Sequence, residues 1–388
     1  MTPFPPFIQR IVDSAYPIPR QLLADQLASI THPLYFVYVA IELAFLLWFY
    51  FSGASASLRT ALETKIKNPL LCAVAFIAIG FAGLSVLMLP MSFYGSFVLS
   101  HQFGLSGETV ERWLRDWLVS LVLSAAVASI AGALLLRAMA RWRAWLIIAA
   151  AGAAALLVFG NAIFPVFIAP LFNKFTPLPA TPLTRAILHL ASSQGINASV
   201  VYEYNMSIQT REANAYVSGL GRTERIAVGD TLLESMPADE VLYVMAHEMG
   251  HYKLGHLWLG TFEAWVFALA ALALVATLGA RLARRNRGRS RDLADPAAVP
   301  LLAALLLGFE IVTMPVANAL SRNIEHAADV FAGEHTNLGD AGVRAQARLA
   351  SIDLSPLHPS PLVVWYFYTH PPSDQRIMDG ARLAHLVR

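Results

Sequence analysis

The sequence contains a single cysteine, Cys72, which lies inside an apolar run. One cysteine excludes an intrachain disulfide and a zinc site built from several thiolates. Charged residues are also scarce, at 14% of the 388 residues, whereas soluble domains carry about a quarter. The net charge is only +2, and the basic residues cluster in loops between apolar runs. Membrane orientation explains such clusters, so nucleic acid is not a predicted partner.

Long apolar runs account for the shortage of charge. Hydrophobic residues make up 56% of the chain, and about six segments are long enough to span a bilayer. These segments lie near 33–52, 70–90, 116–136, 144–168, 257–280 and 299–320. The sequence therefore predicts a mainly α-helical polytopic membrane protein with about six or seven transmembrane helices, and the lipid bilayer as its surroundings.

The chain divides into four predicted parts. They are N-terminal transmembrane helices (1–168), a membrane-edge α+β catalytic unit (169–256), two further transmembrane helices (257–320) and a C-terminal segment (321–388). In the second part we expect a helix over Pro182–Ser193 and a short antiparallel sheet formed by Ser199–Tyr204, Asn214–Ser218 and Arg225–Gly229. Another helix is predicted to start with Pro237 at its first position.

Three apolar segments each contain a carboxylate, namely Glu42, Glu263 and Glu310. An ionisable group within a membrane helix is costly, and it usually faces the protein interior or a water-filled cavity. The three residues therefore favour a polar chamber enclosed by the helices. The alternative is that one or two of them lie near the interface and extend toward water.

The most informative motif is His-Glu-x-x-His at His247–His251, on the predicted helix. A spacing of four places both imidazoles on one helical face, where they can share a zinc ion. Glu248 can then act as general base toward water at that ion. The alternative interpretation is a pair of surface histidines beside a glutamate.

A hydrolytic zinc site needs a third protein ligand and one open position. Glu325 and Asp329 lie four residues apart, so they share a helical face. We expect Glu325 to bind the metal, and Asp329 to accept the outer N–H of a ligand histidine. His326 competes as a ligand but points about 100° away from Glu325. His256 is predicted to be a structural or supporting residue.

With these residues the sequence resembles the type I CAAX prenyl endopeptidases, which are zinc-dependent membrane gluzincins. The resemblance extends from about Leu89 to Ile377. Besides the zinc motif and Glu325–Asp329, its landmarks are Phe97, His101–Leu105, Ala169–Leu178, Asn214–Tyr216, Arg225–Ile226, Asp230–Leu233 and Thr369–Ile377. The resemblance implies a Zn²⁺ cofactor and a peptide or membrane-protein substrate that carries a lipid in the family's known cases.

The resemblance also implies further substrate-binding and catalytic residues. Asn214, Ala215 and Tyr216 match a strand that pairs with the substrate backbone. His370 matches a histidine that stabilises the oxyanion, and its alternative is a turn histidine before two prolines. Arg376 matches a family arginine that either binds a substrate carboxylate or pairs with a nearby acid. Three departures leave the prenylated substrate open. They are one N-terminal span fewer than the family usually has, the segment 207–213 in place of a Ser-rich stretch, and His326 in place of an aromatic residue.

The sequence thus predicts an integral membrane zinc metalloendopeptidase. The alternatives are a broad-specificity quality-control protease like HtpX, an intramembrane site-two-type protease, and a non-enzymatic membrane scaffold or transporter. The Ala-, Leu- and Arg-rich composition favours the inner (cell) membrane of a bacterium. If six spans alternate, the basic loops share one side, and the positive-inside rule predicts that the catalytic unit faces outward. The family resemblance implies a cytosolic catalytic face.

Overall fold

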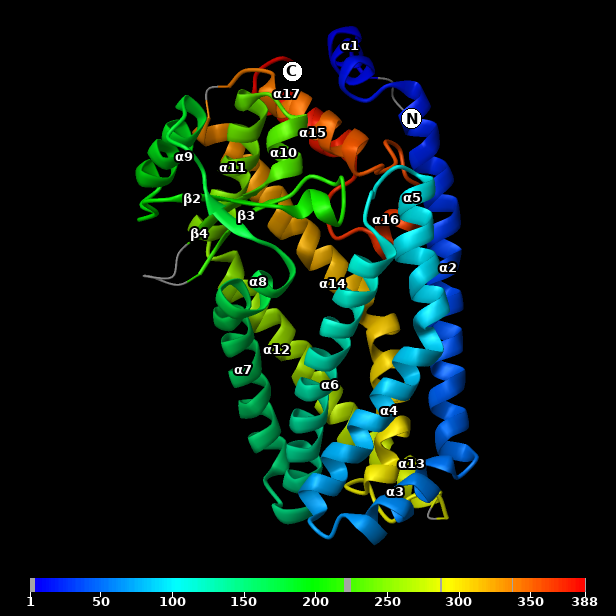
Figure 1. The fold of residues 1–388 in the computed structure, drawn as a ribbon. Helices are drawn as coiled ribbons and strands as arrows, with labels where there is room; N and C mark the ends of the chain where they lie inside the picture. The colour runs from blue at the N-terminus through cyan, green and yellow to red at the C-terminus, as the bar shows by residue number, and fades with distance from the viewer. Residues whose placement is uncertain (1–3, 220–224, 287, 337, 388) are drawn as a thin grey trace.

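The computed structural model describes residues 4–219, 225–286, 288–336 and 338–387, and most of them are helical (Figure 1). In these ranges, six helical runs are long and apolar enough to cross a membrane. They are α2 (Ile18–Phe51); α4 (Pro69–Ser92) with η1 (Phe93–Val98) and α5 (Leu99–Gln102); α6 (Val110–Arg141); α7 (Trp145–Ile163) with η2 (Phe164–Ile168) and α8 (Ala169–Phe172); α12 (His256–Leu274) with η5 (Val275–Gly279) and α13 (Ala280–Arg285); and η6 (Pro296–Ala298) with α14 (Val299–His335). The predicted polytopic helical fold is confirmed.

The shorter elements gather at one end of the spanning helices, shown at the top of Figure 1. They are α1 (Pro6–Ala15), α9 (Pro182–Ser193), η3 (Met206–Ile208), α10 (Asp230–Ser235), α11 (Ala238–Lys253), α15 (Ala341–Ile352), α16 (Pro361–Phe367) and α17 (Ser373–Leu383). At the opposite end lie α3 (Ala54–Lys65) and α13 (Figure 1). The molecule therefore has a membrane bundle and a water-facing unit at one of its ends.

A four-stranded sheet lies in the water-facing unit. Its strands are β1 (Phe175–Pro177), β2 (Val201–Tyr204), β3 (Ala215–Ser218) and β4 (Arg225–Gly229), in the order β1-β2-β4-β3. Strands β1 and β2 are antiparallel, as are β3 and β4, but β2 and β4 are parallel. The prediction of an antiparallel sheet is wrong for this central pair, because β3 intervenes in the sequence and lets the chain return in the same direction. Strand β3 lies at an edge of the sheet.

The sheet and α11 share a hydrophobic core. Ile187 of α9, Val201 of β2, Ile226 of β4, and Met245 and Met249 of α11 are all fully buried in it. Burying a side chain of this size contributes about 1.5–3 kcal/mol. The core fixes α11 against the sheet and so determines which of its faces remains available for chemistry.

Helix α14 continues well past the apolar segment predicted near 299–320. Its 37 residues are uninterrupted, although Pro315 lies within it. The predicted boundary at residue 320 therefore falls inside a helix. As a result, the segment that carries Glu325 and Asp329 is a direct extension of a membrane-spanning helix.

The three carboxylates of the apolar segments lie within spanning helices, with Glu42 on α2, Glu263 on α12 and Glu310 on α14. Helices α2 and α14 pack together, and the Tyr35 hydroxyl lies 3.7 Å from the Met314 sulfur. The polar chamber that these carboxylates favour stays a prediction.

Candidate active site

Helix α11 carries the His-Glu-x-x-His motif, and its two ends are well defined. Pro237 is the N-cap and Ala238 the first helical residue, one position later than predicted. Pro237 has an extended backbone (ψ 153°), so helical geometry begins only after it. After Lys253 the chain turns at Gly255, whose φ of 70° favours glycine, and α12 begins there. This turn directs the catalytic helix into a membrane-spanning one.

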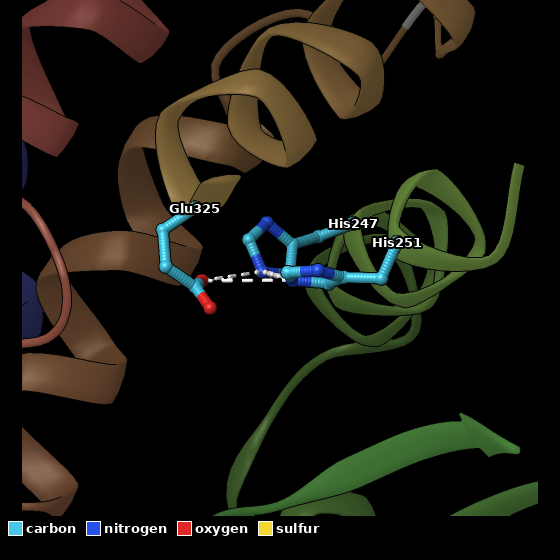
Figure 2. Close-up of side chains that lie close together, drawn as sticks. All are labelled: His247, His251 and Glu325. Atoms are coloured by element: carbon cyan, nitrogen blue, oxygen red, sulfur yellow. Dashed lines mark hydrogen bonds and ion pairs between the residues drawn. The ribbon is translucent and has the colours of Figure 1, made fainter. Parts of the chain in front are cut away.

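The side chains of His247, His251 and Glu325 converge from α11 and α14 (Figure 2). The Nε2 atoms of the two histidines are 3.1 Å apart. The Glu325 Oε2 atom lies 3.2 Å from Nε2 of His247 and 3.6 Å from Nε2 of His251. In a tetrahedral zinc site with metal–ligand bonds of about 2.1 Å, ligand atoms are about 3.4 Å apart. The three atoms therefore have the spacing of one face of such a site.

The Glu325 Oε2 atom is buried, and ring nitrogens of His247, His251 and His370 surround it at 3.2 to 3.6 Å. A buried carboxylate is costly unless a cation or hydrogen-bond donors compensate its charge. A cation bound between this oxygen and the two imidazole nitrogens would remove that cost. Donors of this type, two imidazoles and one carboxylate, are the ligand set of a catalytic zinc site, so the residues present fit the metal that the motif implies.

A second layer of contacts holds the histidines. The His247 Nδ1 atom lies 2.9 Å from Asp329, which is the contact predicted for this aspartate. Arg376 binds both Asp329 oxygens, at 2.7 and 2.8 Å, and Gln346 donates to the same carboxylate. Since the Asp329 carboxylate accepts a hydrogen bond, Nδ1 of His247 carries the ring proton. The lone pair of Nε2 then faces the metal position. The Nδ1 atoms of His251 and His256 are 3.0 Å apart, so His256 supports the second histidine.

His370 reaches the same carboxylate from the loop before α17. Its Nε2 atom lies 3.2 Å from Glu325 Oε2, and its Nδ1 atom lies 3.0 Å from the Thr369 hydroxyl. Since the carboxylate can only accept, Nε2 carries the proton and the hydroxyl donates to Nδ1. His370 therefore presents an N–H group beside the metal position.

A cleft of about 390 Å³ opens on this cluster, and Glu248, His247 and His370 line it. Burial raises the pKa of the Glu248 carboxyl. Burial lowers the pKa of His247, but the carboxylates of Asp329 and Glu325 outweigh this effect and raise the pKa to about 9. Metal binding at His247 would therefore displace a proton.

The predicted substrate strand borders this cleft. Asn214 and Ala215 line the cleft, and Ala215 and Tyr216 belong to the edge strand β3. The Asn214 carbonyl accepts a hydrogen bond from Gly229 on the inner side of the strand. The opposite side of β3 is not paired with another of the four strands.

Two residues take positions that the sequence left open. His326 lies outside the cluster, with its Nδ1 atom 3.6 Å from Asp379. Two roles were considered for Arg376, and in the structure it forms an ion pair with Asp329. Its side chain also lines the cleft. Its predicted role in substrate binding, like the metal-binding, catalytic and substrate-binding roles of the other site residues, stays a prediction.

Sequence reasoning missed several residues of the site. Gln346, in the middle of α15, and Asp353, directly after that helix, line the cleft, and Thr369 contacts His370. Gln346 and Asp353 belong to no recognisable motif, and they reach the cleft only through packing of α15 on α11. Thr369 begins the landmark segment Thr369–Ile377, but its contact with His370 was not predicted.

Comparison with known families covers both parts of the chain. Residues 177–382 match peptidase family M48, and residues 30–174 match the N-terminal part of CAAX prenyl proteases, described as five membrane helices. Within that N-terminal match the described residues form four long apolar runs together with the shorter helix α3.

Similar proteins come from distant organisms. An uncharacterised metalloprotease of Bacillus subtilis, YhfN, is 31% identical over 93% of this chain and 85% of its own length. A CAAX prenyl protease 1 homolog of Oryza sativa is 30% identical over 83% of this chain and 76% of its own. The crystal structure of S. mikatae Ste24p has the same fold, with a TM-score of 0.83 and 24% identity over 96% of this chain and 93% of that chain. The chain therefore belongs to peptidase family M48, as a multi-pass membrane metalloendopeptidase of the CAAX prenyl protease type.

Proposed function

We propose that the protein is a zinc-dependent endopeptidase that binds its substrate as an extended strand beside β3. The observation that carries this proposal is the meeting of three ligand atoms, 3.1 to 3.6 Å apart, in a cleft that an edge strand borders. Zinc held by His247, His251 and Glu325 would act as a Lewis acid toward the scissile carbonyl and lower the pKa of water.

The protein's own groups would perform the proton transfers. Glu248 follows the first ligand and lines the cleft, so it accepts the proton of the attacking water and passes it to the leaving amine. The Nε2–H group of His370 donates to the oxygen on which negative charge develops. Asp329 holds His247 in the tautomer that binds metal through Nε2.

Strand addition would position the substrate. An extended peptide pairs with the free backbone groups of an edge strand, and such pairing recognises the backbone rather than particular side chains. Asn214, Ala215 and Tyr216 would form this edge next to Glu248, with the backbone groups of Ala215 directed away from β4 and toward the substrate. This arrangement supports a peptide or membrane-protein substrate, with or without a lipid. The long match to a Bacillus subtilis protein supports the cell membrane of a bacterium as the location.

The experiment is cleavage of a peptide panel by purified protein in detergent, with Glu248→Gln alongside the wild type. The panel contains prenylated CAAX peptides, the same peptides without the prenyl group, and unrelated sequences. We expect zinc-dependent cleavage that falls about 10²–10⁴-fold in Glu248→Gln, while the bound metal is unchanged. The control is Glu234→Gln, an exposed glutamate of α10.

The panel also distinguishes the substrates. Cleavage confined to prenylated peptides would identify a CAAX-processing enzyme. Cleavage of many unprenylated peptides would identify a broad-specificity membrane protease, which is the alternative represented by HtpX. No cleavage of any peptide by the zinc-loaded wild type would contradict the proposal.

A further inference from the structure

Asp353 is a carboxylate in the catalytic cleft for which the proposed reaction has no use. It lies directly after α15 and lines the same cleft as Glu248 and His370. Its Oδ1 atom accepts a hydrogen bond of 3.0 Å from the backbone N–H of Ala213. Ala213 immediately precedes Asn214, so Asp353 lies beside the start of the proposed substrate strand.

The charge of Asp353 is uncompensated. In the described parts of the chain, no lysine, arginine or histidine lies within ion-pair distance of it. Arg20 binds the carbonyls of Ser351 and Ile352 instead, and Arg376 binds Asp329. Burial raises the pKa of Asp353 to about 7, and the nearby Glu212 carboxylate raises it further. The Ala213 N–H and the more distant charges of Arg20 and Arg376 lower this pKa, but their effect is smaller.

Anchoring the strand does not explain a charged side chain at this position. An asparagine carbonyl would accept the same N–H without the cost of a buried charge. Asp353 also caps the C-terminal end of α15, where the helix dipole disfavours a negative group. A carboxyl group placed in a binding cleft where its charge is so unfavourable indicates that a cation of the ligand compensates that charge.

We propose that Asp353 forms an acidic subsite that binds a lysine or arginine side chain of the substrate peptide. This inference rests on the proposed function, because it requires a peptide strand beside β3. Side chains of an extended peptide alternate between the two faces, so a residue paired near Ala213 can direct its side chain to Asp353. A basic side chain has the length and charge to reach a carboxylate at the side of the cleft.

The test measures peptide binding, so it does not depend on turnover. Fluorescent peptides carry one lysine, moved stepwise through the sequence, and matched peptides carry norleucine there. Their affinities are measured by fluorescence anisotropy on Glu248→Gln protein, which binds without cleaving. We expect one position at which the lysine peptide binds about tenfold or more tighter than the norleucine peptide. This ratio of the two affinities should be larger at pH 8 than at pH 6. In the double variant Glu248→Gln, Asp353→Asn, the ratio should fall to about one.

Asp340→Asn, at the other end of α15, is the matched control and keeps the ratio. Equal affinity of lysine and norleucine peptides at every position would overturn the subsite. So would a preference that survives Asp353→Asn, or a loss of affinity for both peptides with an unchanged ratio, which indicates a purely structural anchor. Cleavage of the norleucine peptides by the wild type reports separately on the proposed function.

Discussion

Asp329 is the single residue on which the organisation of the metal centre depends most. It accepts from His247, from Gln346 and from the Nε and Nη2 atoms of Arg376. A carboxylate in this position orients the ligand imidazole and raises its basicity. Asp329, on α14, therefore links α15 and α17 to the metal ligand on α11.

We expect Asp329→Asn to lower zinc affinity about 10–100-fold. The amide can still accept from His247 through its oxygen, but its NH₂ group then faces the Arg376 donors. Affinity is measured by competition with a chelator of known strength. The control is Asp379→Asn, which removes a carboxylate beside the non-ligand His326. Equal affinities for Asp329→Asn and the wild type would show that Asp329 has no orienting role.

The position of Asp329 in the site is also one that the sequence alone predicts. The four-residue spacing of Glu325 and Asp329 predicts a shared helical face, and the structure has Glu325 at the ligand cluster and Asp329 at His247. No spacing indicates Gln346 or Asp353, because both reach the cleft only when α15 packs on α11. Local periodicity reveals contacts within one helix, whereas contacts between helices need the assembled fold.

At the scale of elements, ion pairs connect α11 to α15. Glu240, in the first turn of α11, is fully buried and binds both Arg344 and Arg348. The two arginines remain 29% and 30% exposed. Asp239, its neighbour in the sequence, also pairs with Arg344 but is 42% exposed. The two adjacent acids thus differ mainly in their burial.

Glu240→Ala is expected to destabilise the protein by about 3 kcal/mol or more, because it leaves two arginines without their buried partner. Asp239→Ala should cost about 1 kcal/mol or less, since an exposed pair contributes little. Thermal unfolding of the metal-loaded protein in detergent measures both variants. Equal shifts in Tm for the two variants would mean that burial of the network contributes nothing.

The elements also differ in how readily the sequence reveals them. The helix Pro182–Ser193 and the strand Arg225–Gly229 agree with their predicted bounds, since each has a clear pattern and clear ends. The parallel pairing of β2 with β4 was not predictable, because alternating residues fix the faces of a strand but not its direction. The three-residue strand β1 is too short to show a pattern.

For the whole molecule, the charge distribution predicts an orientation. The C-terminal ends of α3, α6 and α13, which carry Lys65, Arg141 and Arg285 respectively, lie at the end opposite the sheet (Figure 1). Basic loops of this kind remain in the cytoplasm. The catalytic unit is then expected on the outer side of the membrane, whereas the family resemblance implies the cytosolic side.

Cysteine labelling in intact cells tests this orientation. In a Cys72→Ala background, we expect a membrane-impermeant maleimide to label Asn197→Cys, in the catalytic unit, and not Gly288→Cys, in a basic loop. Both positions are exposed. Both cysteines should react once the cells are permeabilised. The reverse pattern in intact cells would place the catalytic unit in the cytosol.

Helix α14 joins the two ends of the molecule. It begins beside Asp295, which is paired with the buried Arg59 of α3, and it reaches Glu325 without a break. At 1.5 Å per residue its 37 residues measure about 55 Å. If the helix moved as one body, a tilt of a few degrees at the basic end would displace Glu325 by an ångström or more. Lipid thickness, which influences the tilt of spanning helices, would then affect the spacing of the ligand atoms.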